Sequence, residues 1–167
     1  MYHLAEAYLM AAYICLLAVY VGALTFGAAA VAPTAVRLLD APNCALFLRS
    51  FWVTYHRLGA FGGIVLTLIM AAASTLTAVP LLYTTAMLAL ASCMTLCFWV
   101  GLQVIPSINA ARDRGDEVTF IRLHRMDLIL VSVGLLFALA LMGGLVYVLP
   151  GQFTFWPTAM ETNHTPG

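Results

Sequence analysis

The sequence predicts an all-α membrane protein, with four transmembrane helices in an antiparallel bundle and a short interfacial amphipathic helix between helices 1 and 2. Hydrophobic residues make up 63% of its 167 residues and charged residues 8%, whereas about 25% of a typical soluble chain is charged. Its mean hydropathy is +0.99. Three long stretches carry no charge, namely 7–36, 58–111 and 128–160. They are continuously apolar, which favours helices over the alternating strands of a membrane barrel.

The number of spans follows from the lengths of these stretches. About 20 helical residues cross a hydrocarbon core, so the first and third stretches hold one span each. The middle stretch is too long for one helix, and proline in a helix interior costs about 3 kcal/mol, so we expect a tight turn at Thr77-Ala78-Val79-Pro80. The predicted spans, within one membrane domain over 1–150, are about 7–31, 58–76, 81–105 and 126–148. The tail, 151–167, is expected to be short, interfacial and partly disordered.

The basic residues predict the orientation. All seven are arginines, balanced by seven acids, and this balance argues against a large basic face for nucleic acid. The arginines fall only in the segments that join spans one to two and three to four: Arg37, Arg49, Arg57, Arg112, Arg114, Arg122 and Arg125. By the positive-inside rule both segments are cytoplasmic. The termini are then outside, and we expect a bacterial inner membrane.

The segment before span two has the pattern of an amphipathic helix. Asp40 or Asn43 suits a helix N-cap, and a proline between them is tolerated in the first turn. Apolar residues then recur at roughly helical spacing, while arginines and a histidine form the polar face: Leu46, Phe47, Phe51, Trp52 and Tyr55 against Arg49, His56 and Arg57. This pattern predicts a helix lying in the membrane interface.

The segment before span four combines a helix end with a helix start. Gly115 suits the end of the third helix, and Asp116 and Glu117 suit the positive N-terminus of the next. The fourth helix is therefore expected to begin in the cytoplasm.

Small residues predict where the helices pack closely, because spans in lipid gain little from hydrophobicity against one another. The candidate contacts are Gly59 with Gly63, Ala23 with Gly27, and Gly143-Gly144. We expect them to serve packing within the bundle, with a dedicated oligomer face as the alternative.

The sequence carries no classical catalytic pattern: it has no GxSxG, P-loop or HExxH motif and no lysine. It therefore does not favour an enzyme. We also expect no acidic group inside the membrane bundle, and this expectation disfavours an ion-coupled transporter.

Two histidines are the first candidate ligands. His56 and His124 each precede a span on the arginine-bearing side, and two facing imidazoles bind haem iron or a divalent metal. In the alternative reading each histidine only forms hydrogen bonds at the headgroup level, beside Arg57 and Arg125. The cofactor is thus unknown, and haem or a metal ion is not the favoured reading.

Two cysteines are a weaker candidate. Cys93 and Cys97 share a face of span three, and thiolates bind soft cations such as Cu(I). Two thiols do not fill a coordination shell, so ordinary packing is the favoured reading.

Arg57, Arg122, Arg125 and Asp127 form a predicted charged cluster at the membrane interface. We expect Asp127 to pair with one of these arginines. The alternative is a site for an anionic headgroup or ligand.

Three stretches together resemble the TMEM205-like (DUF4149) family of four-helix membrane proteins. They are 21–33, 51–56 leading into a glycine-rich span, and 120–127, whose F-x-x-L-H element is the most specific. The chain departs from the family pattern at Trp52, where proline is frequent, and at Asp127, where serine is frequent. The resemblance implies fold and membrane location but no established reaction.

The sequence therefore predicts a small membrane protein that acts as an accessory or scaffold subunit against partner membrane proteins or further copies of itself. The alternative is a protein that binds or conducts haem, a metal or a small solute. A membrane-embedded enzyme of the haem- or quinone-linked kind is a third reading.

Overall fold

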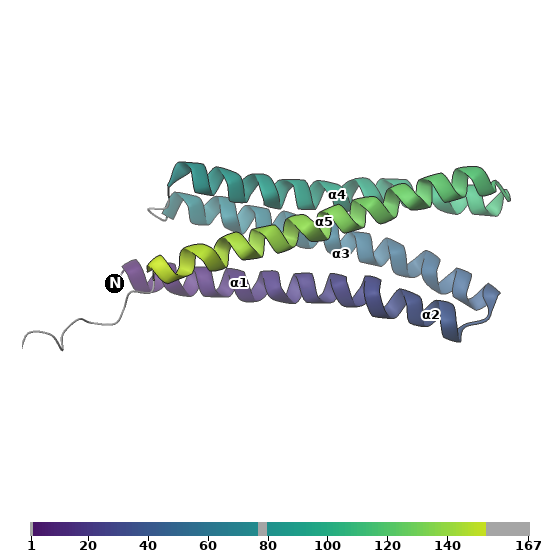
Figure 1. Ribbon diagram of the computed structural model, residues 1–167, viewed down its shortest axis with the longest axis horizontal. Helices are drawn as coiled ribbons and strands as arrows, with labels where there is room; N and C mark the ends of the chain where they lie inside the picture. Colours follow the sequence, from purple (N-terminus) through teal and green to yellow (C-terminus); the bar gives the residue numbers. More distant parts are fainter. Residues whose placement is uncertain (1, 77–79, 153–167) are drawn as a thin grey trace, which may run out of the picture.

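Four long helical segments lie side by side in an elongated bundle (Figure 1). The computed structural model describes residues 2–76 and 80–152, and the surroundings of side chains for 8–75 and 80–146. Each segment is long and apolar enough to cross a membrane, and the described ranges contain no strand. The predicted all-α four-helix bundle is confirmed.

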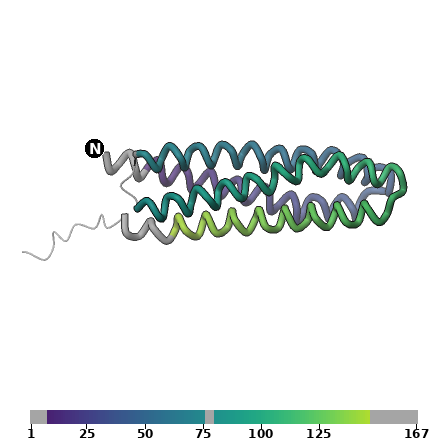
Figure 2. The backbone as a smooth tube through the Cα atoms, turned by 90° about the horizontal axis from the view of Figure 1, so that it is seen from above, coloured from purple at the N-terminus to yellow at the C-terminus, as the bar shows by residue number. Residues whose placement is uncertain are grey.

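The two connections that join the arginine-bearing parts of the helices lie at the same end of the bundle (Figure 2). One joins α2 (Ala32–Leu38) to α3 (Ala41–Leu76), and the other joins α4 (Leu81–Asp113) to α5 (Glu117–Gln152). We call this end, where Asp40 and Gly115 lie, the arginine end. The first helix, α1 (Tyr2–Phe26), begins at the opposite end and packs against α3 and α5, and α4 packs most extensively, against its neighbours α3 and α5.

The first membrane segment extends beyond its predicted end at residue 31. A five-residue π-helical turn, η1 (Gly27–Val31), joins α1 to α2, and the Ala32 N–H donates to the Gly27 carbonyl. Pro33 follows directly and has no N–H to donate. A π turn accommodates this missing hydrogen-bond donor without ending the helix, so the helical segment continues to Leu38.

The predicted separate interfacial helix is wrong, because α3 is continuous from Ala41 to Leu76. The helix start is where the sequence placed it, and Asn43 Nδ2 donates to Asp40 Oδ1 over 2.6 Å. No breaker follows before the predicted span. Phe51 and Tyr55 are 5.8 Å apart between ring centroids; Tyr55 belongs to the core cluster and Phe51 packs against it, whereas Leu46 and Phe47 at the start of the same face are exposed.

The third segment also runs further than predicted. The predicted span ended at residue 105, but α4 continues through Pro106 to Asp113. Ile105, Ile108 and Ala111 are buried, and their packing offsets the backbone hydrogen bond that the proline removes.

The turn between α4 and α5 confirms both sequence predictions about it. Gly115 has φ +68°, and the Asp116 N–H donates to the Ala111 carbonyl over 3.0 Å, as in a Schellman C-cap. Asp116 Oδ1 then accepts from the Thr119 N–H over 3.0 Å, capping α5. This helix reaches Gln152, so the expectation for the tail applies to 153–167, which lie outside the described residues.

Glycines on α3 and α5 allow α4 to approach closely. A Cβ on Gly59 would lie 2.4 Å from the Phe98 ring, one on Gly63 2.5 Å from Thr95, and one on Gly134 3.0 Å from Phe98. The Gly59/Gly63 pair therefore serves packing within the bundle, as predicted. The Ala23/Gly27 pair does not form one contact, because Gly27 packs against Tyr55 whereas Ala23 is exposed.

Candidate functional site

The bundle contains a buried pair of ionisable side chains, His56 on α3 and Asp127 on α5. His56 is 0% exposed and Asp127 2%. His56 Nε2 and Asp127 Oδ1 are 3.0 Å apart, and neither atom has a hydrogen-bond partner among the described residues. The two groups are therefore held against each other and away from solvent.

A glycine on α4 provides the space for this pair. A Cβ on Gly101 would lie 2.4 Å from both Cδ2 and Nε2 of His56 and 3.2 Å from Asp127 Oδ1. Any larger residue at position 101 would displace the imidazole. Three helices thus form the site. His56 lies on α3, Asp127 lies on α5, and Gly101 of α4 leaves space for both side chains.

The orientation of the imidazole follows from its other nitrogen. His56 Nδ1 lies 2.9 Å from the Trp52 carbonyl oxygen, one turn earlier on α3. A carbonyl oxygen only accepts hydrogen bonds, so Nδ1 carries the proton of this bond. Nε2 is left to face the carboxyl group.

A proton between these facing atoms would hold them together. Without it, two lone pairs would approach to 3.0 Å. With it, the pair is either an imidazolium beside a carboxylate or a neutral imidazole beside a carboxylic acid. Both forms have zero net charge, which lowers the cost of burial.

Aromatic rings surround the imidazole. The ring centroids of Trp52, Tyr55 and Phe98 lie 6.1, 5.6 and 6.2 Å from that of His56. The Tyr55 hydroxyl is buried without a hydrogen-bond partner in the described part of the chain, whereas the Tyr20 hydroxyl donates to the Gly59 carbonyl over 2.6 Å. The site therefore has an apolar wall with one unused hydroxyl.

Buried Asp127 overturns the expectation that no acid lies inside the bundle. The sequence placed it at the margin of span four and assigned it to the interface. However, α5 begins ten residues earlier, at Glu117, which is about 15 Å along a helix. The helix thus carries Asp127 inward from the arginine end, and Asp127 is buried beside His56 of α3 and Gly101 of α4.

The two histidines are not brought together as facing ligands. His56 contacts Asp127, whereas the His124 ring stacks on Phe120 with centroids 5.6 Å apart and is half-buried. No cluster of three or more histidine, cysteine, aspartate or glutamate side chains among the described residues could hold a metal ion. The geometry thus offers no ready site for haem or a metal at this pair.

The two cysteines lie toward the outside of α4. Cys93 is exposed and Cys97 half-buried, and both are free thiols. A Cβ on Gly134 would lie 3.3 Å from Cys97 Cβ, so Cys97 packs against α5, consistent with the favoured packing reading.

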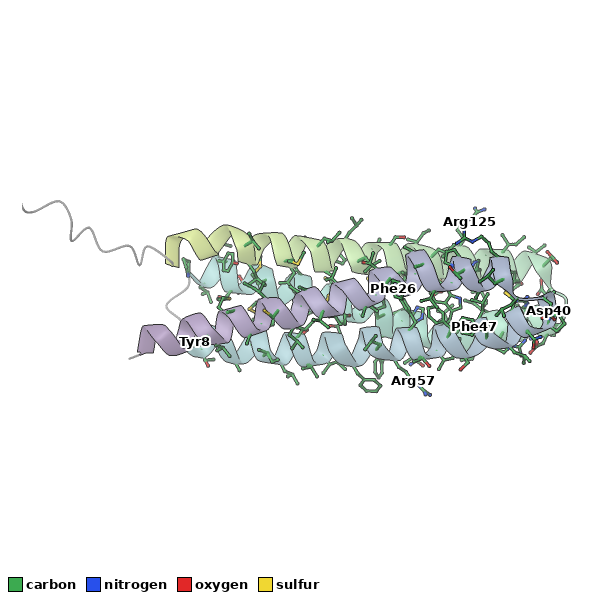
Figure 3. The ribbon with its side chains drawn as sticks, turned by 90° about the horizontal axis from the view of Figure 1, so that it is seen from below. Tyr8, Phe26, Asp40, Phe47, Arg57 and Arg125 are labelled. Carbon is green, nitrogen blue, oxygen red and sulfur yellow. The ribbon has the colours of Figure 1, made fainter. Side chains whose placement is uncertain are left out.

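The predicted charged cluster does not assemble. Arg57, Arg122 and Arg125 are exposed, and Arg57 and Arg125 lie on opposite sides of the bundle (Figure 3). Asp127 is buried beside His56 instead of pairing with any of them. The charged contact that links two helices near the turn is between Arg49 on α3 and Asp113 on α4, where Nη1 donates to Oδ2 over 3.1 Å.

Sequence reasoning missed Gly101 and Tyr55 as parts of the site. From the sequence alone, an isolated glycine in an alanine-rich span does not indicate which side chains of neighbouring helices pack against it. Tyr55 belongs to the aromatic face that the sequence assigned to the interface. The pairing of His56 with Asp127 across 71 positions has no local signal either.

No protein-family model matches the chain, and no curated protein or solved structure matches it.

Proposed function

We propose that this four-helix membrane protein binds and releases a proton at the His56–Asp127 pair. The observation that carries the proposal is the 3.0 Å approach of two buried atoms that have no other partner among the described residues. An ionisable residue inside a membrane bundle is costly and is by default a candidate for function. A histidine is the side chain whose charge changes most readily near neutral pH.

Proton exchange is proposed to occur from the arginine end. Asp127 lies about 15 Å along α5 from that end. On the other side of Gly101, Phe98 and Met94 of α4 and Leu66 of α3 are at most 1% exposed. Ile105 and Ile108 are also buried on the arginine side, but Asp127 is much nearer to the start of α5 than to its end at Gln152, so the shorter route to water leads toward the arginines.

A role as an accessory subunit is the second candidate. The buried apolar side chains of Phe98, Met94 and Leu66 in the interior favour it over a channel for a solute. In this reading the bundle supplies its proton-binding pair to a partner membrane protein or to a second copy. Orientation with the arginine end in the cytoplasm, a bacterial inner membrane and a place in the TMEM205-like (DUF4149) family belong to the same proposal.

Infrared difference spectroscopy of the reconstituted protein tests proton binding. A step between about pH 5 and pH 8 should change a carboxyl C=O or a carboxylate stretching signal that is missing in Asp127→Asn and shifted in His56→Gln. Asp113→Asn, which removes an exposed acid, is the matched control and should leave that signal unchanged. If the wild-type protein shows no signal specific to Asp127, the pair is a static structural contact and the proposal fails.

A further inference from the structure

An open groove lies between α3 and α4, on the outer surface of the bundle. Its volume is about 390 Å³, and its lining residues are Ile64, Thr67, Leu68, Ser92, Thr95, Leu96 and Trp99. Leu68 is 64% exposed and Leu96 59%. Both helices are long and apolar enough to span a membrane, so this groove faces lipid once they are inserted.

The surface of the groove is mostly apolar, although serine and threonine side chains contribute to its lining. Thr67 Oγ1 donates to the Gly63 carbonyl over 2.8 Å, and Thr95 Oγ1 donates to the Ala91 carbonyl over 2.8 Å. These donors are satisfied within their own helices. The occupant that fits such a lining is a hydrocarbon chain.

A cation lies on the same face of α3. Arg57, Ile64 and Leu68 are seven and four residues apart and therefore share one stripe of the helix. Arg57 is about 10 Å from Ile64 along the axis, toward the arginine end. It is exposed, and no acidic partner is found for it in the part of the chain that the structure describes. An unpaired cation at one end of an apolar groove complements an anionic head on an acyl chain.

We propose that this groove binds one anionic phospholipid from the surrounding bilayer, with an acyl chain along Ile64, Leu68 and Leu96 and its phosphate at Arg57. Trp99 lies at the edge of the groove and is 42% exposed. Tryptophan favours the level of the headgroups, so its indole is placed beside the glycerol region of the lipid. A zwitterionic lipid carries its own cation and gains less from Arg57.

Fluorescence of Trp99 tests the proposal. In a Trp52→Phe/Trp156→Phe background, the protein is reconstituted into phosphatidylcholine nanodiscs that contain a small fraction of brominated phosphatidylglycerol or brominated phosphatidylcholine. Bromine quenches tryptophan at short range. We expect the anionic lipid to quench Trp99 several-fold more than the zwitterionic lipid at equal mole fraction, and Arg57→Gln to remove this difference.

Matched variants separate a lipid site from general charge and from misfolding. Arg125→Gln removes the same charge on the opposite side of the bundle (Figure 3) and should leave the preference intact. Ser92→Phe fills the groove and should abolish the preference, whereas Ser132→Phe makes the same change at an exposed position on α5 and should not. Equal quenching by the two lipids in the wild-type background overturns the proposal, as does an equal loss in Arg57→Gln and Arg125→Gln. The thermal unfolding midpoint of each variant establishes that it is folded.

Discussion

At the scale of single residues, the site depends on the lack of a side chain at Gly101. Gly101 lets the His56 imidazole lie between α3 and α4 while Asp127 approaches from α5. The imidazole is then fixed by the Trp52 carbonyl on one side and by the carboxyl group on the other. The position of the two side chains thus depends on helix packing as well as on the interaction between the imidazole and the carboxyl group.

Gly101→Ala should therefore destabilise the protein by about 2 kcal/mol, the usual cost of forcing extra atoms into a packed interior. The added methyl group would lie 2.4 Å from the His56 ring. The free energy of unfolding in detergent measures the effect. Gly143→Ala is the control, because a Cβ there meets nothing within 4 Å and alanine favours a helix over glycine. Equal stability of the two variants would contradict the packing argument.

The residues of the site could be predicted only in part from the sequence. His56 was identified as a candidate because it precedes a span on the arginine-bearing side, and Asp127 because it borders a span. Their partnership was missed, since it depends on the rotation of α5 relative to α3. That rotation is set by contacts such as Phe98 against Gly59 and Gly134, and no local pattern in the sequence reports it.

At the scale of the elements, three prolines affect their helices in three different ways. Pro80 precedes α4 as its N-cap residue, as predicted. Pro33 follows a π turn and lies within a continuous helical rod, and Pro106 lies inside α4. The cost of a proline is local and fixed, whereas the packing of the flanking turns differs from site to site. Helix ends were therefore predicted well at caps, as at Asp40 and Asp116, and poorly at prolines within packed segments.

The cap of α5 gives a prediction about pH. The Thr119 N–H, donating to the Asp116 carboxylate, holds the pKa of that carboxyl below its ordinary value of 3.8. Because the pKa is lower in the folded state, the stabilisation is complete above about pH 4 and is lost as the pH falls through the folded value. Asp116→Ala should lower the thermal unfolding midpoint at neutral pH, and its difference from wild type should shrink in acid.

Asp116→Asn provides the control for this cap, because asparagine also caps a helix but does not titrate in this range. Its midpoint should stay near that of wild type at neutral pH. A difference between wild type and Asp116→Ala that is the same at neutral and acidic pH would show that cap geometry dominates and that charge contributes little.

At the scale of the whole molecule, composition was sufficient to predict the class of fold. The long uncharged stretches and the break at Pro80 gave four spans, and the chain folds as four antiparallel segments. The arginine-bearing connections lie together at one end (Figure 2). The sequence could not show how far the helices extend past the membrane, because charged residues such as Arg49 and Arg112 continue helices outside lipid as readily as they end them.

The proposed orientation gives a prediction for reporter fusions. A reporter that is active only outside the cytoplasm should be active when fused after Gly167 and inactive when fused after Gly115. The physical reason is the attraction that retains arginine-rich connections in the cytoplasm. Activity in the opposite pattern would reverse the orientation.

The depth of the His56–Asp127 pair also has an electrical consequence. Phe98 and the apolar core behind it leave the arginine end as the proposed entrance for a proton. A proton that enters from that end moves through part of the electric field across the membrane, and a full crossing is worth about 2.3 kcal/mol per 100 mV. Under the proposed function, and with Arg57 beside a lipid phosphate as proposed, the pair lies at one edge of that field, so its occupancy follows the pH at the arginine end far more than the membrane potential.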